Sequence, residues 1–289
     1  MKQVKKSLSE LAQIAMMLEV SCKTKPGNVD RHHDYDDTWL EHFLASAIFA
    51  KPAFEKAENF GAAKINTKTG TPALSGNFGI GGLIYDAVAL TNTHSGGNTH
   101  FGAFILLMPL IAGKGIEGAE KIIRAATVED AVLFYRAFGL TSVRMNESDE
   151  MDVNDPKAVL MLREKNMTLY DVMEYSSKCD MVSKEWVSGF RLTRQTADFL
   201  LSSGKGKDAV SDAYMALLAS EEDTFVAKKL GREVSLWTMQ TAQKVLSGEV
   251  NAGEFDCMCL SKGINPGSTA DIIIAGIFIA LLEGWEWDC

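Results

Sequence analysis

The feature that most constrains the fold is an apolar run of 11 residues, from Ile272 to Leu282, near the C-terminal end of the chain. A helix that crosses a bilayer needs about 20 such residues, so this run is too short to span a membrane. It is almost continuously apolar and leaves no polar face for solvent. Other elements must therefore surround it, and we predict a buried central helix here.

Signals for amphipathic helices recur along the rest of the chain. Ser7 and Glu10 have the spacing of a capping box, which predicts a helix from Leu8 to about Cys22. Strand-like alternation and hairpin turns are nearly absent. Further helices are predicted from Asp36 or Asp37 to about Pro52, at 79–93, at 100–112, from Thr127, from Thr168, and at 180–202, 207–220, 231–247, 253–262 and 268–284. We predict an all-α protein in which residues 1–289 form a single multi-helix globular domain.

Charge and cysteine content exclude several classes of protein. The net charge is −9, so a basic surface for nucleic acid or anionic lipid is not expected. The five cysteines lack the spacing of a disulfide framework, and no nearby histidine completes a zinc site with Cys257 and Cys259. Glu10 and Glu19 interrupt the apolar stretch after the first lysines, which argues against a signal peptide. We expect a cytoplasmic protein with reduced thiols.

The first candidate site is the polar turn at residues 25–37, between two predicted helices. It contains two cations, Lys25 and Arg31, together with four aspartates and two histidines. Clustered carboxylates can hold Mg²⁺ through oxygen ligands and its retained waters, and the two cations can contact phosphate oxygens. The structural alternative is a solvated loop in which Asp36 or Asp37 caps the following helix.

The second candidate site is the turn at residues 93–102, which leads into a very apolar helix. It places Gly96 and Gly97 between His94 and His100. Glycines before a helix N-terminus let backbone N–H groups approach a phosphate, which the helix dipole also favours. The structural alternative is a tight turn between helices with a capping side chain.

Two more charged segments lie in the C-terminal half. Residues 265–271 lead into the last apolar helix, and Asp271 stands directly before Ile272. A carboxylate beside a buried core usually has a partner, which can be a cation, a metal ion or backbone donors. Residues 221–224 are acidic and are followed by Lys228, Lys229 and Arg232. The structural alternative for this segment is a charged helix start stabilised by i,i+4 pairs.

These four segments, in this order, resemble the triphosphoribosyl-dephospho-coenzyme A synthase family. Residues 18–19 and 25–30 are similar to the family's LE…PKPGxVD pattern, and residues 97–107 to its NTH-x-G…LL segment. Asp223-Thr224 resembles its DTN, and residues 266–271 are similar to its SPGGSAD. The sequence departs from the family at Phe225, where the family has Asn, and at 33–37, where it has GAHxDM.

The resemblance implies an unusual use of ATP. A hydroxyl group of 3'-dephospho-coenzyme A or a related coenzyme precursor attacks C1′ of the ATP ribose, adenine leaves, and a 5-triphosphoribosyl group is transferred. The product is a precursor of the prosthetic group of citrate lyase-type acyl carriers. The reaction passes through an oxocarbenium-like state. It needs a base for the hydroxyl, a proton or hydrogen bond for the departing adenine, and cations for the triphosphate.

The matching residues supply three sets of candidate side chains. The proposed catalytic residues are Asp30, His33, His100 and Asp271. The proposed nucleotide- and phosphate-binding residues are Lys25, Gly27, Arg31, Gly97, Asn98, Thr99, Lys228, Gly267 and Ser268. The proposed ligands of the Mg²⁺ that accompanies ATP are Asp30, Asp36, Asp37, Asp223 and Asp271. We expect Asp30, His33, Asn98, His100, Asp223 and Asp271 to line one cleft, and the sequence leaves open which carboxylate is the base.

Two other functions stay open at this stage. One is another Mg²⁺-dependent nucleotide hydrolase on a helical scaffold, and the other is a non-catalytic helical nucleotide-binding protein. Helical nucleotide pyrophosphatases typically carry paired E-x-x-E and E-x-x-D motifs, and we find no such pair. The expected partners are ATP and a coenzyme-type acceptor, without nucleic acid or membrane, and a homo-oligomer stays open.

Overall fold

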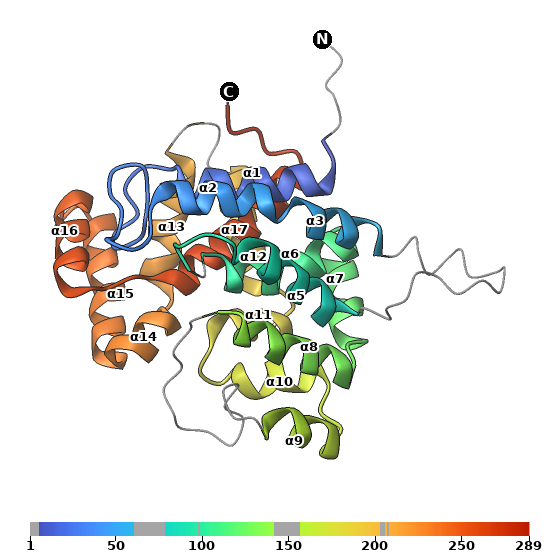
Figure 1. The fold of residues 1–289 in the computed structure, drawn as a ribbon. Coiled ribbons are helices and arrows are strands. Elements are labelled where there is room, and N and C mark those ends of the chain that lie inside the picture. The colour runs from blue at the N-terminus through green and yellow to red at the C-terminus, as the bar shows by residue number, and fades with distance from the viewer. Residues whose placement is uncertain are drawn as a thin grey trace, which may run out of the picture.

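The computed structural model describes residues 6–60, 79–97, 99–141, 157–202, 206 and 208–288, and within these ranges the regular secondary structure is helical, with no strand. This confirms the predicted all-α class (Figure 1). The helices are α1 Leu8–Val20, α2 Leu40–Phe49, α3 Lys51–Glu58, α5 Ile80–Thr91, α6 Phe101–Gly113, α7 Ile116–Arg124, α8 Val128–Gly139, α9 Ala158–Glu164, α10 Leu169–Ser176, α11 Met181–Val187, α12 Arg191–Ser202, α13 Ala209–Ser220, α14 Thr224–Leu230, α15 Arg232–Leu246, α16 Ala252–Lys262 and α17 Gly267–Leu282.

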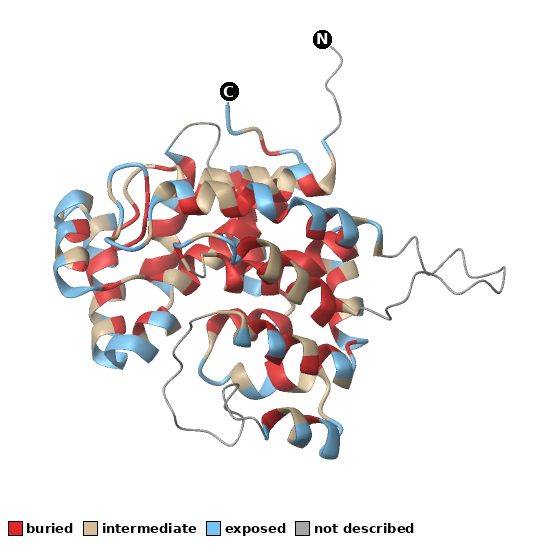
Figure 2. Cartoon of the chain, viewed as in Figure 1, coloured by how far each residue is buried: buried red, intermediate tan, exposed pale blue. Residues whose placement is uncertain are grey.

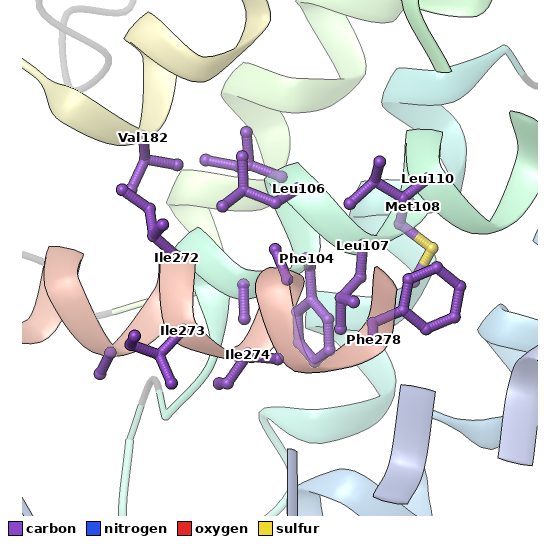
Figure 3. Packing of buried hydrophobic residues seen from close by; sticks show 14 of the residues in the cluster. Phe104, Leu106, Leu107, Met108, Leu110, Val182, Ile272, Ile273, Ile274 and Phe278 are labelled. Carbon is purple, nitrogen blue, oxygen red and sulfur yellow. The ribbon is translucent and has the colours of Figure 1, made fainter. Parts of the chain in front are cut away.

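Helix α17 is the buried centre predicted from the apolar run. Residues 272–280 are buried without interruption, and the helix packs against α1, α6, α12 and α13 (Figure 2). Figure 3 shows Ile272 beside Val182 of α11, and Phe278 beside Leu107 and Met108 of α6. The largest helix-on-helix contact is with α12. Burial on all sides explains why this helix carries no polar stripe.

No single helix among the described residues is long and apolar enough to cross a membrane, and the one pair with sufficient combined length, α6 and α7, is bent by 105°. The four cysteines that the structure describes, Cys22, Cys179, Cys257 and Cys259, are free.

Capping chemistry fixes several helix starts where the sequence predicts them. Ser7 accepts a hydrogen bond from the Glu10 backbone, and the Glu10 side chain accepts one from the Ser7 backbone. The same reciprocal pair occurs at Thr127 with Asp130 and at Thr168 with Asp171. These short-range patterns determine helix N-termini because the first-turn N–H groups have no partner within the helix.

The prediction of one helix over 180–202 is wrong, because the structure has two helices, α11 and α12, in this segment. The chain breaks between α11 and α12 at Gly189 and Phe190, which both have positive φ. The buried Glu185 carboxylate accepts hydrogen bonds from the Leu192 and Thr193 backbone N–H groups at 3.0 and 2.7 Å. A side chain of α11 therefore caps α12, and the helix axis can change direction here.

The start of the second helix is also corrected. It begins at Leu40, so neither Asp36 nor Asp37 caps it. Instead, the Asp34 carboxylate caps the helix by accepting a hydrogen bond from the Leu40 N–H at 2.7 Å. The helix ends before Pro52, as expected, and Pro52 lies in the first turn of α3, where its missing N–H has no cost.

The close contact of α12 and α17 gives the first testable prediction. A Cβ atom on Gly276 would lie 2.3 Å from Thr196 Cγ2, so Gly276→Ala forces the two helices apart. Overpacking of this kind destabilises by about 1–3 kcal/mol, which a denaturant melt measures. Gly139→Ala, on α8, is the matched control, because a Cβ there meets nothing within 4 Å. Equal stability of the two variants would contradict this packing.

Candidate active site

The four segments singled out in the sequence meet around the N-terminal end of α17. The Asn28 side chain donates to the Pro266 carbonyl at 3.2 Å, which joins the first turn to the last. The Asp223 carboxylate accepts hydrogen bonds from the Thr269 N–H and hydroxyl at 2.7 and 2.8 Å. Asp271 lies against Gly102 at the start of α6. Contacts between residues up to 238 positions apart thus build one polar centre on an apolar helix.

The buried charge of the first turn belongs to an ion pair. Lys25 is fully buried, and its Nζ lies 2.5 Å from Oε1 of Glu19, which is 2% exposed on α1. Burial raises the pKa of Glu19, and the Lys25 ammonium opposes this shift. The pair places a carboxylate and an ammonium beneath the polar centre with almost no solvent access.

His33 lies between two carboxylates. Its Nδ1 is 3.4 Å from Asp30 Oδ1 and 3.4 Å from Asp256 Oδ2. Asp30 also accepts hydrogen bonds from the backbone N–H groups of Lys25 and His32 at 2.8 and 2.7 Å. Burial acts to raise the pKa of Asp30, but the His33 side chain and these two backbone donors outweigh it and lower the pKa. The Asp30 contact and the negative potential of Asp256 raise the pKa of His33, which favours an imidazolium.

Gly27 allows the first turn to lie close to the C-terminal segments. Its φ is +77°, and a Cβ atom would lie 2.3 Å from the Ile264 carbonyl oxygen. Its N–H donates to Asp256 Oδ1 at 2.9 Å, and its carbonyl accepts from the Tyr35 hydroxyl at 2.5 Å. Any other residue here would move the turn away from α16 and α17.

His100 is held as a neutral imidazole at the start of α6. It is 2% exposed, and burial together with the positive potential of Lys25 lowers its pKa to about 3. Its Nδ1 lies 2.9 Å from the buried Ser46 hydroxyl on α2, while its Nε2 has no hydrogen-bond partner in the described part of the chain. A buried ring nitrogen without a partner is an exception that calls for an explanation, and a ligand atom would satisfy it.

Ser46 therefore fixes the orientation of the His100 ring, and its removal gives the second prediction. Ser46→Ala frees Nδ1, so we expect a loss of about tenfold in turnover with little change in KM. Nitrogen NMR of the imidazole should show a change in its tautomer balance. A variant with unchanged turnover and unchanged imidazole signals would contradict the role of Ser46.

The Asp271 carboxylate lies at the N-terminus of α6. A Cβ atom on Gly102 would lie 2.0 Å from Asp271 Oδ2, so only glycine allows this approach. The Ala103 N–H donates to the carboxylate. Burial, reinforced by the neighbouring charges of Glu19 and Asp223, nevertheless raises the pKa of Asp271 well above its usual range. A half-buried carboxylate of this kind takes up a proton more readily than an ordinary aspartate.

Asp223 is held mainly by its own backbone surroundings. As the N-cap of α14, its Oδ1 accepts from the N–H groups of Phe225 and Val226 at 2.9 and 3.0 Å. Its Oδ2 accepts both Thr269 donors, so each oxygen has two partners. Asp223 connects α14 to the start of α17, and the Phe225 ring lies against Gly267 there.

The other residues proposed from the sequence lie around this centre. The Arg31 Nε donates to the Ser21 carbonyl at 2.6 Å at the surface, and Lys228 forms an ion pair with Asp180. Asp36 and Asp37 are exposed, and Gly97 has a φ of +65°. Ser268 is buried with its hydroxyl 3.3 Å from that of Thr224. Thr99 and Gly267 lie at the starts of α6 and α17, whereas Asn98 lies outside the described residues.

The carboxylates suit a magnesium ion that arrives with its own ligands. Among the described residues, no three His, Cys, Asp or Glu side chains are arranged to hold a metal ion by themselves. Both oxygens of Asp223 are occupied, while Asp271 accepts from Ala103 and Asp36 is open to solvent. Mg²⁺ characteristically keeps waters and phosphate oxygens and adds only one or two carboxylates, so an ion brought by a phosphate ligand would need no preformed cluster.

Sequence reasoning did not assign Glu19, Ser46 or Asp256 to the site. Glu19 had a usable signal, because it lies on the buried face of α1 beside Met16 and Val20, where a carboxylate requires a partner. Asp256 contacts a residue 229 positions away and carries no local pattern. Ser46 is one of several serines on predicted helices, and nothing nearby in the sequence singles it out.

A helical protein that gathers a buried imidazole, several carboxylates and a buried ammonium into one polar centre has the features of an enzyme. The profile of the ATP:dephospho-CoA triphosphoribosyl transferase family matches residues 5–289. The chain belongs to this family.

Two relatives support the assignment. A protein of Citrobacter koseri, named a probable 2-(5''-triphosphoribosyl)-3'-dephosphocoenzyme-A synthase, is 25% identical over 286 residues, which cover 94% of this chain and 89% of the relative. A crystal structure from Archaeoglobus fulgidus, described as a candidate triphosphoribosyl-dephospho-CoA synthase, is 32% identical with a TM-score of 0.69. That match covers 86% of this chain and all of the other. The chain is thus a transferase, and the hydrolase and binding-protein alternatives are not favoured.

Proposed function

We propose that this enzyme transfers the 5-triphosphoribosyl group of ATP to a hydroxyl of 3'-dephospho-coenzyme A or a related coenzyme precursor, and that adenine is released. The bond from the acceptor oxygen to C1′ forms while the bond from C1′ to the adenine nitrogen breaks. The acceptor proton goes to a protein base, and the departing adenine receives a proton. The family match over residues 5–289 is the observation that carries the proposal.

The geometry supports particular roles for the ionisable groups. We assign the acceptor proton to Asp271, because a carboxylate with a raised pKa is a more effective base near neutral pH. We assign the proton for adenine to His33, whose raised pKa favours the protonated ring. The neutral His100 has a buried Nε2 available for a hydrogen bond to the nucleotide. Asp30 supports the charged form of His33.

Magnesium is proposed to enter with ATP and to reach the protein through one or two of the carboxylates Asp30, Asp36, Asp37 and Asp271. Asp223, the fifth carboxylate proposed from the sequence, has both oxygens occupied by donors of the protein. The bound ion would act on the phosphates. It neutralises part of the triphosphate charge, which an acidic chain cannot otherwise hold near its own carboxylates. The residues proposed to contact phosphate are the glycine-containing turns and Lys228, since the buried Lys25 is engaged by Glu19 and Arg31 by a carbonyl at the surface. We further infer a cytoplasmic location, in keeping with the free cysteines.

The test is a search for free adenine. Purified enzyme is incubated with MgATP and 3'-dephospho-coenzyme A, and the bases and nucleotides are separated by chromatography. We expect adenine to form in proportion to the acceptor, with magnesium required. Formation of ADP or AMP in place of adenine would contradict the proposal and would favour a hydrolase.

A further inference from the structure

One group of cations lies beside the site described above, and of these only Lys228 is among the residues proposed from the sequence to bind phosphate. This group lines a pocket of about 710 Å³ between the α10–α11 segment, residues 177–181 with Lys184, and the α14–α15 segment, which contributes Thr224, Ala227, Lys228 and Arg232. Leu192, Met239 and residues 220–222 complete the lining. The cations are Lys178 before α11, Lys184 on α11, Lys228 on α14 and Arg232 on α15. We call this cavity the α11–α15 pocket. A cluster of four cations is unexpected in a chain whose net charge is −9.

Ion pairs neutralise every carboxylate of the pocket. Asp180 pairs with Lys228, and Glu222 receives a two-point contact from Arg232 at 3.1 Å for each bond. Glu221 pairs with Arg191, which lies outside the lining, at 2.6 Å. These pairs leave the ammonium groups of Lys178 and Lys184 in excess.

Lys178 and Lys184 form no ion pair within the described part of the chain. Lys178 Nζ instead lies 5.4 Å from the centre of the Tyr175 ring, and Lys184 is exposed on α11. The pocket thus presents two uncompensated positive charges to an incoming ligand. Positive potential in a concave surface concentrates anions.

The pocket adjoins the candidate active site. The Thr224 hydroxyl, which belongs to its lining, lies 3.3 Å from the Ser268 hydroxyl in the first turn of α17. The Asp180 carboxylate is close enough to Asp271 to disfavour its charged form. A ligand in the pocket could therefore extend to the proposed base.

We propose that the α11–α15 pocket binds the polyphosphate chain of a nucleotide substrate, with Lys178 and Lys184 contacting the phosphates. This inference rests on the proposed function and deepens it, because it places the phosphates beside α11 and α15. The ammonium of Lys25 is already engaged by Glu19, and Arg31 is engaged by a carbonyl at the surface. The polyphosphate can belong to either of two molecules: it is the triphosphate of ATP or the pyrophosphate of a coenzyme-type acceptor.

Calorimetric titration of the full chain tests the inference with three probes, namely inorganic tripolyphosphate, MgATP and 3'-dephospho-coenzyme A. We expect Lys178→Gln with Lys184→Gln to weaken tripolyphosphate binding about tenfold or more, and each single change by about threefold. The loss should shrink at high salt because the lysines are exposed. Lys244→Gln is the matched control, since it removes the same charge from α15 about 18 Å along the helix from Arg232.

The MgATP and 3'-dephospho-coenzyme A probes identify which molecule places its phosphates in the pocket. Weaker binding of MgATP alone assigns the pocket to the donor triphosphate, and weaker binding of 3'-dephospho-coenzyme A alone assigns it to the acceptor. Unchanged binding of all three probes by the double variant overturns the inference, as does an equal loss in Lys244→Gln. Adenine release by the unmodified enzyme tests the proposed function separately. If adenine is released but the double variant binds all probes normally, the role of the pocket is wrong and the transfer reaction stands. If the double variant binds more weakly but the unmodified enzyme releases no adenine, the transfer reaction is wrong and the role of the pocket stands.

Discussion

Asp271→Asn is expected to lower kcat/KM for adenine release by about 100-fold or more, with the fold preserved. The substitution keeps the shape of the side chain and removes its ability to accept a proton. Because the folded state already disfavours the charge at this position, a neutral amide should not lower the free energy of unfolding. Activity and stability are therefore expected to separate.

The control is Asp198→Asn, which makes the same chemical change at an exposed position of α12. Gly102→Ala provides a second route to the same site, since its methyl group would displace the Asp271 carboxylate and should also reduce turnover. Thermal melts with and without MgATP complete the test. If Asp271→Asn melted much lower yet kept the full ligand shift and full turnover, Asp271 would be a structural residue.

Lys25→Met is expected to destabilise the fold by about 3–5 kcal/mol, because it leaves the Glu19 carboxylate buried without its partner. The double variant Glu19→Leu with Lys25→Met removes both charges, so we expect it to recover much of this loss. Urea denaturation at neutral pH measures each free energy of unfolding. If the double variant is more stable than the single variant Lys25→Met, the two charges stabilise the fold as a pair. If their effects simply add, each residue contributes independently.

A surface pair provides the comparison. Lys56 Nζ lies 2.7 Å from Asp86 Oδ2, but the lysine side chain is 61% exposed. We expect Lys56→Met to lower stability by less than about 1 kcal/mol, because solvent screens the exposed pair. Similar losses for Lys25→Met and Lys56→Met would show that the Glu19–Lys25 pair is not isolated from water.

Local patterns in the sequence predicted most of the helices. The capping boxes at Ser7, Thr127 and Thr168 and the apolar run of α17 are short-range signals that tertiary packing reinforced. The break between α11 and α12 was missed because its cause is the buried Glu185 carboxylate, which caps the second helix from the first. Capping by a residue of a different helix has no fixed spacing to recognise.

For the site, the sequence motifs indicated which segments matter but not how their residues pair. Gly102 and Asp271 are 169 positions apart in the chain, and only the packing of α6 on α17 places the carboxylate against the glycine. Lys25 stood in the motif as a phosphate-binding candidate, and the fold pairs it with Glu19. Pairing of this kind depends on which helix faces become buried together.

The most direct test of the transfer reaction follows the ribose of ATP. ATP carrying isotopic label in the ribose alone is incubated with the enzyme, magnesium and 3'-dephospho-coenzyme A, and the products are analysed by mass spectrometry. We predict unlabelled free adenine and an acceptor whose mass increases by one labelled triphosphoribosyl group. Label recovered in ADP, AMP or free ribose phosphates, with the acceptor unchanged in mass, would contradict the reaction proposed for this enzyme.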